Sequence, residues 1–367
     1  MRACIACLAC ILFASPMMLS ANELVRAGDA RIRYMGRWEV KPGAATTVNS
    51  GSGILFRFQG SRLKGVFELT PSKIHPQVYV SIDGGAKELF ALNAPEMDFA
   101  PAKLQEGAHT VEIMVKDVYQ EVNRWVPPFQ SALIFLGFDL GEGGTALDPA
   151  PALVGRWSPG ALKITFIGDS ITEGIRALSM STAPEGSEGT MTYSYLTSLA
   201  LEANVTQVGF GAQGLVNRGV GDVPPVEGTY ALNFAGSPVD PSFQPDVIVI
   251  NQGTNDGAVP AAAFQADYLR FLKEIRASYP RARVFAMRPL NGTHGADILA
   301  AVAGLNDRRI TYVDTAGWLE LSNSPDYTEK PHGLHPSLEG HAKAALRLTA
   351  VLRDAGVGQL TPTGSSR

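Results

Sequence analysis

The first half of the chain, from about residue 24 to residue 140, has the hydrophobic pattern of short strands. Apolar residues alternate with polar ones or form short runs, and no stretch shows a helical period. The pattern predicts strands at residues 54–58, 63–69, 78–82, 111–115 and 132–138. Asp83-Gly84-Gly85, directly after the third run, is typical of a hairpin turn. We therefore predict an N-terminal all-β domain over residues 24–140, folded as a jelly-roll-like sandwich.

The pattern changes beyond residue 160. Fully apolar runs at residues 164–167, 247–250 and 284–287 are each followed by a loop and then by a helical stretch. The clearest helix has one apolar face, formed by Phe264, Tyr268, Phe271, Leu272 and Ile275. A second helix is predicted at residues 338–352, just after Pro336. Because strands without a polar side need cover on both faces, residues 161–358 should form a three-layer α/β domain with a parallel sheet.

Two further segments lie outside these domains. Residues 141–160 are rich in Gly and Pro, and we interpret them as a linker. Residues 1–21 have a basic start, an apolar run and small residues at the end, which is typical of a secretory signal peptide. All three cysteines, Cys4, Cys7 and Cys10, lie in this segment, so we expect a secreted or periplasmic mature protein without cysteine. The alternatives are an uncleaved anchor and lipidation at Cys10.

Composition and charge narrow the range of partners. Charged residues make up 18% of the chain, and 31 basic residues against 35 acidic ones give a net charge of -4. No basic surface for nucleic acid is implied. No stretch after the signal segment reaches the roughly 18 apolar residues of a membrane span. We therefore expect neither a nucleic-acid partner nor a membrane span.

Three polar motifs follow predicted strands or precede the last helix. Ser170 ends the first strand of the α/β part, Asn255 follows the strand at residues 247–250, and His335 stands just before the C-terminal helix. Ligands of open α/β sheets bind at the carboxyl ends of the strands. A serine with a base within hydrogen-bond reach and an amide that can donate to an oxyanion are the parts of an acyl-transfer site.

These motifs resemble those of the SGNH (GDSL-type) hydrolase superfamily. Gly168-Asp169-Ser170 is similar to its nucleophile block, Gly253-Thr254-Asn255-Asp256 to its asparagine block, and His335-Pro336 to its histidine block. All three stand in the superfamily's order. No Gly-x-Ser-x-Gly is present, so the nucleophile elbow of ordinary α/β-hydrolases is absent.

The N-terminal half narrows the resemblance to carbohydrate esterase family 2. Tyr34-Met35-Gly36-Arg37-Trp38, residues 82–85 and residues 109–112 look like the β-domain that precedes the SGNH domain in that family. The resemblance implies a secreted esterase that removes O-acetyl groups from an acetylated polysaccharide or oligosaccharide, such as xylan or mannan.

The resemblance also implies roles for individual residues. Ser170 would attack the acetyl carbon, with His335 as the general base and then the general acid. The oxyanion would be held by the Ser170 N–H, the Asn255 amide, and an N–H of Ala212 or Gly211 in the second block, residues 209–214. The superfamily usually has glycine where Ala212 stands, and a backbone N–H there survives the change to alanine only if the local φ is negative. Asp256 is expected to cap the turn that follows it.

The acidic partner of the histidine is the main departure from the superfamily pattern. The superfamily usually has aspartate three residues before the histidine, where this chain has His332. Some members of carbohydrate esterase family 2 use a backbone carbonyl there, which gives a Ser–His dyad. Asp326 or Glu329 could instead supply the acid. We favour the dyad, because both lie in a segment of Asn, Ser, Pro and Lys with no evident reason to be buried.

The remaining alternatives concern metals and function. His332, His335 and His341 have a spacing that suggests a metal, but Gly333 and Pro336 argue against a shared helical face, and no acid cluster completes a ligand set. We expect no metal and no cofactor. An esterase acting on another exported substrate, such as bacterial polysaccharide, peptidoglycan or a lipid ester, is the first alternative function. A catalytically degenerate carbohydrate-binding protein is the second.

Overall fold

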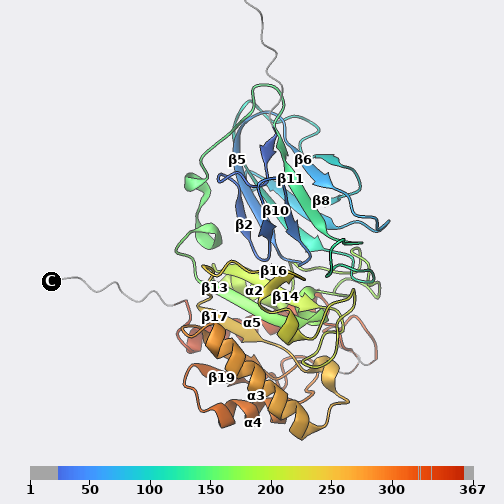
Figure 1. The fold of residues 1–367 in the computed structure, drawn as a ribbon, viewed down its shortest axis with the longest axis vertical. Coiled ribbons are helices and arrows are strands. Elements are labelled where there is room, and N and C mark those ends of the chain that lie inside the picture. The colour runs from blue at the N-terminus through green and yellow to red at the C-terminus, as the bar shows by residue number, and fades with distance from the viewer. Residues whose placement is uncertain (1–23, 321, 323, 332, 359–367) are drawn as a thin grey trace, which may run out of the picture.

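The computed structural model describes residues 24–320, 322, 324–331 and 333–358. The predicted signal segment, with its three cysteines, and His332 lie outside the described residues. Figure 1 shows an antiparallel β region packed on one end of an α/β region. This order, β first and α/β second, confirms the predicted fold class.

Two antiparallel sheets form the N-terminal region. One has the order β3 (Glu39–Val40), β4 (Ala45–Thr47), β11 (Leu133–Asp139), β6 (Lys64–Glu68), β9 (Glu96–Asp98), with β1 (Val25–Arg26) paired to β11. The other has the order β12 (Thr145–Ala146), β5 (Gly53–Gly60), β10 (Gly107–Asp117), β7 (Gln77–Ile82), β8 (Glu88–Ala91), with β2 (Arg33–Met35) paired to β5. Alternate side chains of both sheets meet in one apolar core, which is what a sandwich requires.

The predicted hairpin is present between β7 and β8. These two strands pair as antiparallel neighbours, with Val80 opposite Glu88. Asp83 and Gly84 both take positive φ, at 53° and 71°, and the Gly85 N–H donates to the Ile82 carbonyl. Two positive φ values in a row define the tight turn that matches the twist of paired strands.

The C-terminal region contains a five-stranded parallel sheet. Its order is β14 (Asn204–Phe210), β13 (Lys163–Asp169), β17 (Val247–Ile250), β18 (Arg283–Met287), β19 (Ile310–Val313). The helices of this region are α1 (Ser170–Glu173), α2 (Tyr193–Ala200), α3 (Ala261–Ser278), α4 (Gly295–Leu305) and α5 (Leu338–Asp354). Short elements between them are β15 (Leu232–Phe234), β16 (Ser237–Pro238), and the 3-10 turns η3 (Val226–Gly228) and η4 (Thr254–Asp256).

Alternation along β17 explains why its residues are all apolar. Val247 and Val249 belong to the core that includes α2 and α5, whereas Ile248 and Ile250 belong to the core that includes α3 and α4. Both faces of the strand are therefore covered by helices. The three-layer arrangement follows from this double burial.

The two regions are connected by residues 141–160 and also by side-chain contacts across their boundary. Residues 141–160 contain β12 and the 3-10 turns η1 (Ala150–Ala152) and η2 (Gly155–Trp157), and their assignment as a linker stays a prediction. An apolar cluster crosses the boundary, with Trp125 packed edge-on against Phe210 at a ring distance of 5.4 Å. No helix in the described part of the chain is long and apolar enough to cross a membrane.

Candidate active site

Three neighbouring strands end at the same edge of the parallel sheet and carry the predicted site residues there. Ser170 follows β13, Gly211 and Ala212 follow β14, and Asn255 lies in η4 after β17. Because β13 pairs with both β14 and β17, the serine stands between the other two segments. Together with His335 they line one cleft of about 210 Å³.

The structure brings Ser170 and His335 into hydrogen-bond contact. His335 Nε2 lies 3.0 Å from Ser170 Oγ, and the two residues are only 7% and 4% exposed. Ser170 is the first residue of α1, and the Asp169 carboxylate caps this helix by accepting the Ile171 N–H at 2.9 Å. A serine hydroxyl at this distance from an imidazole nitrogen can pass its proton to the ring.

Glu329 lies on the other side of the imidazole, so His335 has a carboxylate partner and not the backbone carbonyl that the favoured Ser–His dyad predicted. Its Oε1 lies 2.8 Å from His335 Nδ1, and its Oε2 accepts the N–H groups of Leu334 and His335 at 2.7 and 3.0 Å. Arg176 Nη1 also donates to Oε1, at 2.8 Å. The expectation that this segment has no reason to be buried was wrong, because four donors hold a largely covered carboxylate.

The charge on Glu329 follows from these contacts. Its partial burial acts to raise the pKa, but the hydrogen bonds and charge of His335, together with the backbone donors, outweigh burial and hold the pKa of Glu329 well below its usual value. The carboxylate therefore stays ionised beside the ring. An anion at Nδ1 fixes the tautomer that leaves Nε2 free to take a proton.

Asp326, the other acidic candidate, has a different set of partners. It is 1% exposed, accepts the Glu320 N–H at 3.0 Å, and pairs with Lys343 Nζ at 2.5 Å. Burial acts to raise its pKa, but the bond from Lys343 and the Glu320 N–H outweigh this and lower it. Asp326 therefore ties the loop before His335 to α5.

Ala212 corrects one backbone expectation. Its φ is 57°, in the left-handed region, and not the negative value that an alanine N–H at this position was expected to require. Non-glycine residues adopt this region at a cost of order 1–3 kcal/mol and do so mainly where the surroundings enforce it. The second block thus keeps the backbone shape that a glycine would give, although alanine occupies the position.

Asn255 and Asp256 link the second and third blocks. Asn255 Nδ2 donates to the Gln213 carbonyl at 2.8 Å. Asp256 does not cap the following turn as expected; its carboxylate reaches back to the second block and accepts the N–H groups of Leu215, Val216 and Asn217. The buried aspartate therefore fixes the relative position of the segments that carry Ala212 and Asn255.

Several cleft residues had no signal in the sequence. Arg176 and Thr182 come from the segment after α1, and Gln120 and Glu121 come from the N-terminal domain. Gln120 is 3% exposed, and its Oε1 has no hydrogen-bond partner among the described residues. An ideal Cβ at Gly211 would lie 1.8 Å from that oxygen, so the side chain packs where only glycine leaves room.

Asp169 and His341 are buried titratable groups near the site. Burial raises the pKa of Asp169 to about 6, although the hydrogen bond from the Ile171 N–H acts in the opposite direction. Burial lowers the pKa of His341 to about 3, and its Nδ1 accepts the Tyr193 N–H at 3.1 Å. Among the described residues no group of three His, Cys, Asp or Glu side chains could hold a metal ion.

Two family models match the chain, one in each half. Residues 34–151 match the carbohydrate esterase 2 N-terminal domain, and residues 166–343 match the GDSL-like lipase/acylhydrolase family. The chain therefore combines a GDSL-like lipase/acylhydrolase domain with the N-terminal domain of carbohydrate esterase family 2. The chain is thus a carboxylic ester hydrolase.

Known relatives of the GDSL-type acylhydrolase carry matching names. The cellulase/esterase CelE of Acetivibrio thermocellus is 27% identical over 340 residues, which cover 88% of this chain. The match spans only 39% of that relative's length. The acetylxylan esterase/glucomannan deacetylase of Cellvibrio japonicus is 25% identical over 357 residues, or 92% of each chain.

Solved structures share the two-domain fold. A family two carbohydrate esterase from Clostridium thermocellum, in complex with cellohexaose, gives a TM-score of 0.70 at 26% identity over 88% of this chain and 98% of its own. The family two carbohydrate esterase from Cellvibrio japonicus gives a TM-score of 0.72 at 23% identity over 90% and 97%. The latter likeness shows the fold alone.

Proposed function

We propose that this GDSL-type acylhydrolase removes O-acetyl groups from a polysaccharide or oligosaccharide through an acyl-enzyme on Ser170. The observation that carries the proposal is the line of three side chains at the cleft. Ser170 Oγ, the His335 ring and the Glu329 carboxylate follow one another at 3.0 and 2.8 Å. The same cleft is lined by Ala212 and Asn255.

The proposed reaction begins when Ser170 Oγ attacks the acetyl carbonyl carbon and His335 Nε2 takes the hydroxyl proton. The ring becomes an imidazolium, which the Glu329 carboxylate stabilises from Nδ1. The carbonyl oxygen becomes an oxyanion, and we assign the Ser170 N–H, the Ala212 N–H and Asn255 Nδ2 as its donors. Each such donor typically contributes about 2.7–4 kcal/mol to transition-state stabilisation.

The tetrahedral intermediate then breaks its bond to the sugar oxygen. His335 returns its proton to that oxygen, so the sugar leaves as an alcohol and the acetyl group stays on Ser170. A water molecule next attacks the acyl-enzyme while His335 accepts its proton, and a second collapse releases acetate and restores the serine. No cofactor takes part in this sequence of steps.

The substrate class rests on the relatives. One is named an acetylxylan esterase and glucomannan deacetylase, and a structural neighbour binds cellohexaose. These names support an acetylated plant polysaccharide such as xylan or mannan. They favour it over bacterial polysaccharide, peptidoglycan or a lipid ester.

We further propose that the protein acts outside the cytoplasm. The pattern of residues 1–21 supports export, and an enzyme that acts on a polymeric polysaccharide reaches its substrate outside the cell. Expression of the full chain followed by cell fractionation and N-terminal sequencing tests this. Protein that is found in the cytoplasmic fraction and still begins at Met1 would contradict export.

Acetate release from acetylated xylan, acetylated glucomannan, acetylated peptidoglycan and a lipid ester tests the function. We expect the highest kcat/KM on one of the two plant polysaccharides and release at background level from Ser170→Ala. Wild-type release by Ser170→Ala would overturn the nucleophile. Faster turnover of peptidoglycan or lipid ester would overturn the substrate class, and binding without any release would favour the degenerate binding protein.

A further inference from the structure

Helix α1 is a single turn, from Ser170 to Glu173. Helical segments this short are not stable by themselves, so contacts outside the helix must fix the direction in which the nucleophile points. The Asp169 cap holds the first end. The other end is tied to Ser170 by the N–H groups of Gly174 and Ile175, which donate to the Ser170 carbonyl at 2.9 and 3.0 Å.

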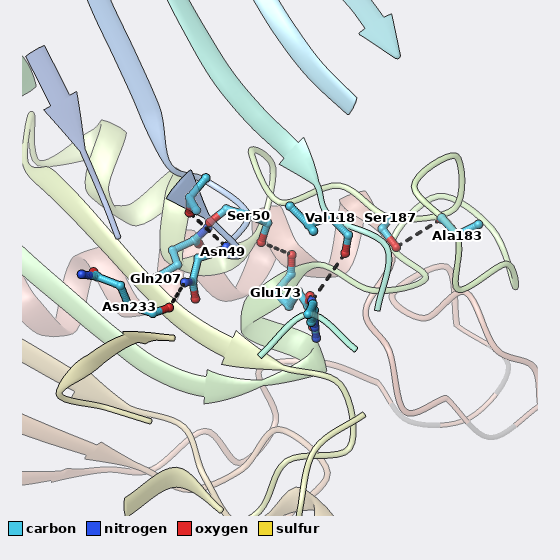
Figure 2. Close-up of polar contacts among 10 residues, drawn as sticks. Asn49, Ser50, Val118, Glu173, Ala183, Ser187, Gln207 and Asn233 are labelled. Carbon is cyan, nitrogen blue, oxygen red and sulfur yellow. Dashed lines mark hydrogen bonds and ion pairs between the residues drawn. The ribbon is translucent and has the colours of Figure 1, made fainter. Parts of the chain in front are cut away.

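The last residue of this turn, Glu173, is held by the N-terminal domain. Ser50 Oγ donates to the Glu173 carbonyl at 2.8 Å, and Figure 2 shows these two groups facing each other across the domain boundary. Both terminal nitrogens of Arg124 contact the Glu173 carboxylate, Nη1 at Oε1 and Nη2 at Oε2, the latter at 3.1 Å. The two side chains are 0% and 1% exposed.

The surroundings of Arg124 make this contact specific. Its guanidinium lies 5.0 Å from the centre of the Phe210 ring, at the end of β14. The neighbouring Asp117 is buried with both carboxylate oxygens unpartnered among the described residues. Burial, and then the charge of Glu173, raise the pKa of Asp117 well above its usual value. The terminal nitrogens of Arg124 bond to Glu173 and to the Val118 carbonyl, and not to Asp117.

We propose that the N-terminal domain positions the nucleophile, with Ser50 and Arg124 fixing the end of α1 through Glu173. Docking of the domains alone does not need a buried ion pair, because an apolar cluster already joins them and buried pairs are weak evidence of stability. A two-pronged guanidinium–carboxylate contact does fix direction. This inference rests on Ser170 being the nucleophile, as proposed above.

A displaced nucleophile has a measurable signature. A misplacement of about 1 Å can lower the rate about 10²-fold, while substrate binding elsewhere in the cleft is unchanged. Variants that release the end of α1 should therefore show a fall in kcat with little change in KM. They should also show slower labelling of Ser170 by a serine-directed fluorophosphonate, a readout that needs no sugar substrate.

The first test compares two small changes at the domain boundary. Ser50→Ala removes the hydroxyl that donates to the Glu173 carbonyl. Asn49→Ala is the matched control, because Asn49 Nδ2 reaches Asn233 O at 3.5 Å across the same boundary without touching α1 (Figure 2). We expect Ser50→Ala to lower both kcat and the labelling rate by about three- to tenfold with KM within twofold, and Asn49→Ala to leave all three unchanged.

The second test separates positioning from docking. Replacement of a buried ion pair by apolar residues often restores stability. We expect Arg124→Met/Glu173→Met to melt close to the wild type while kcat and the labelling rate stay at least about tenfold lower. A double variant that regains wild-type kcat together with its melting temperature overturns the inference.

The outcomes distinguish this inference from the proposed function. Absence of acetate release and of Ser170 labelling in the wild type would remove the proposed function and the inference with it. A wild type that is active and labelled, beside a Ser50→Ala variant with wild-type kcat and labelling rate, overturns the positioning role alone. An equal loss in Asn49→Ala does the same, since it would assign the effect to general loosening of the boundary. If the double variant does not fold, the Ser50→Ala comparison decides.

Discussion

The two sides of the Ser170–His335 contact are held in different ways. On the oxyanion side, the residues that we propose as donors follow directly from strands β13, β14 and β17, and the buried Asp256 carboxylate ties two of these segments together through backbone N–H groups. On the acid side, Glu329 lies in a loop before α5 and is held by His335, Arg176 and two backbone N–H groups. One side depends on sheet geometry, and the other on the charge of a single carboxylate.

This contrast shows where the sequence of such a site can vary. Donors to an oxyanion must be placed within a few tenths of an ångström, which strand ends provide and loops rarely do. The acid must only offer an ionised oxygen at Nδ1. A loop carboxylate that gathers enough donors can meet that need from a different position in the chain.

Replacement of the acid should have the largest effect. Glu329→Gln keeps the shape of the side chain but removes the charge and allows the wrong histidine tautomer. We expect kcat on an acetyl ester to fall by up to about 10⁴-fold, the scale seen when a triad aspartate becomes asparagine. Asp326→Asn is the matched control, since its carboxylate pairs with Lys343.

The same pair of variants tests which carboxylate serves His335. We expect Asp326→Asn to keep kcat within about threefold of the wild type, because Asp326 does not contact His335. Steady-state kinetics of both variants decide between the acids. A Glu329→Gln enzyme with near wild-type kcat would restore the dyad, and a large loss in Asp326→Asn would shift the role to that residue.

Loss of an oxyanion donor should come next in size. Asn255→Ala removes the Nδ2 donor while leaving the backbone of η4 in place. We expect kcat to fall about 10²–10³-fold with KM little changed, because the donor acts on the charge that develops in the transition state. A variant whose KM rises while kcat holds would instead make Asn255 a substrate-binding residue.

Asp256→Asn tests whether the oxyanion side depends on backbone anchoring. The amide can accept fewer of the three N–H groups that the carboxylate accepts, so at least one of these donors loses its partner. We expect a loss of about 1–3 kcal/mol in the free energy of unfolding, and a fall in kcat of about tenfold. Denaturant unfolding and kinetics on the same preparation check both numbers. Unchanged kcat would show that the two blocks keep their spacing without the carboxylate.

Much of this arrangement was predictable because it is local in sequence. The hairpin at Asp83-Gly84, the fully apolar β17 and the serine after β13 each leave a pattern within a few residues. Glu329 could be named only as one of two possible acids, because it stands six residues before His335, whereas the superfamily pattern has an acid three residues before the histidine. Its burial depends on Arg176, which is distant in the chain.

The remaining surprises have the same physical origin. Asp256 and Ala212 take their conformations from a neighbouring segment, so no local rule gives the left-handed φ of Ala212 or the reach of Asp256. Gln120 and Arg124 meet the site only because two domains pack together. Contacts between segments that are far apart in the chain need the fold before they can be stated.

A further prediction concerns how the free energy of unfolding depends on pH. Asp169 has its pKa raised from 3.8 to about 6 by burial, so the folded state binds this proton more tightly than the unfolded chain does. The free energy of unfolding should therefore fall as pH rises from about 4 to about 6, by an amount of the order of 3 kcal/mol for this group. Asp169→Asn should remove that part of the pH dependence. Parallel pH profiles for variant and wild type would contradict the assignment.

The most direct test of the account is to find the acyl group. The Glu329→Gln variant should deacylate slowly, since the same imidazole must activate the water. When it is mixed with 4-nitrophenyl acetate, quenched and digested, mass spectrometry should find one acetyl group, on the peptide that carries Ser170. An acetyl group on another residue, or none while acetate is still released, would contradict the assignment of Ser170 as the nucleophile.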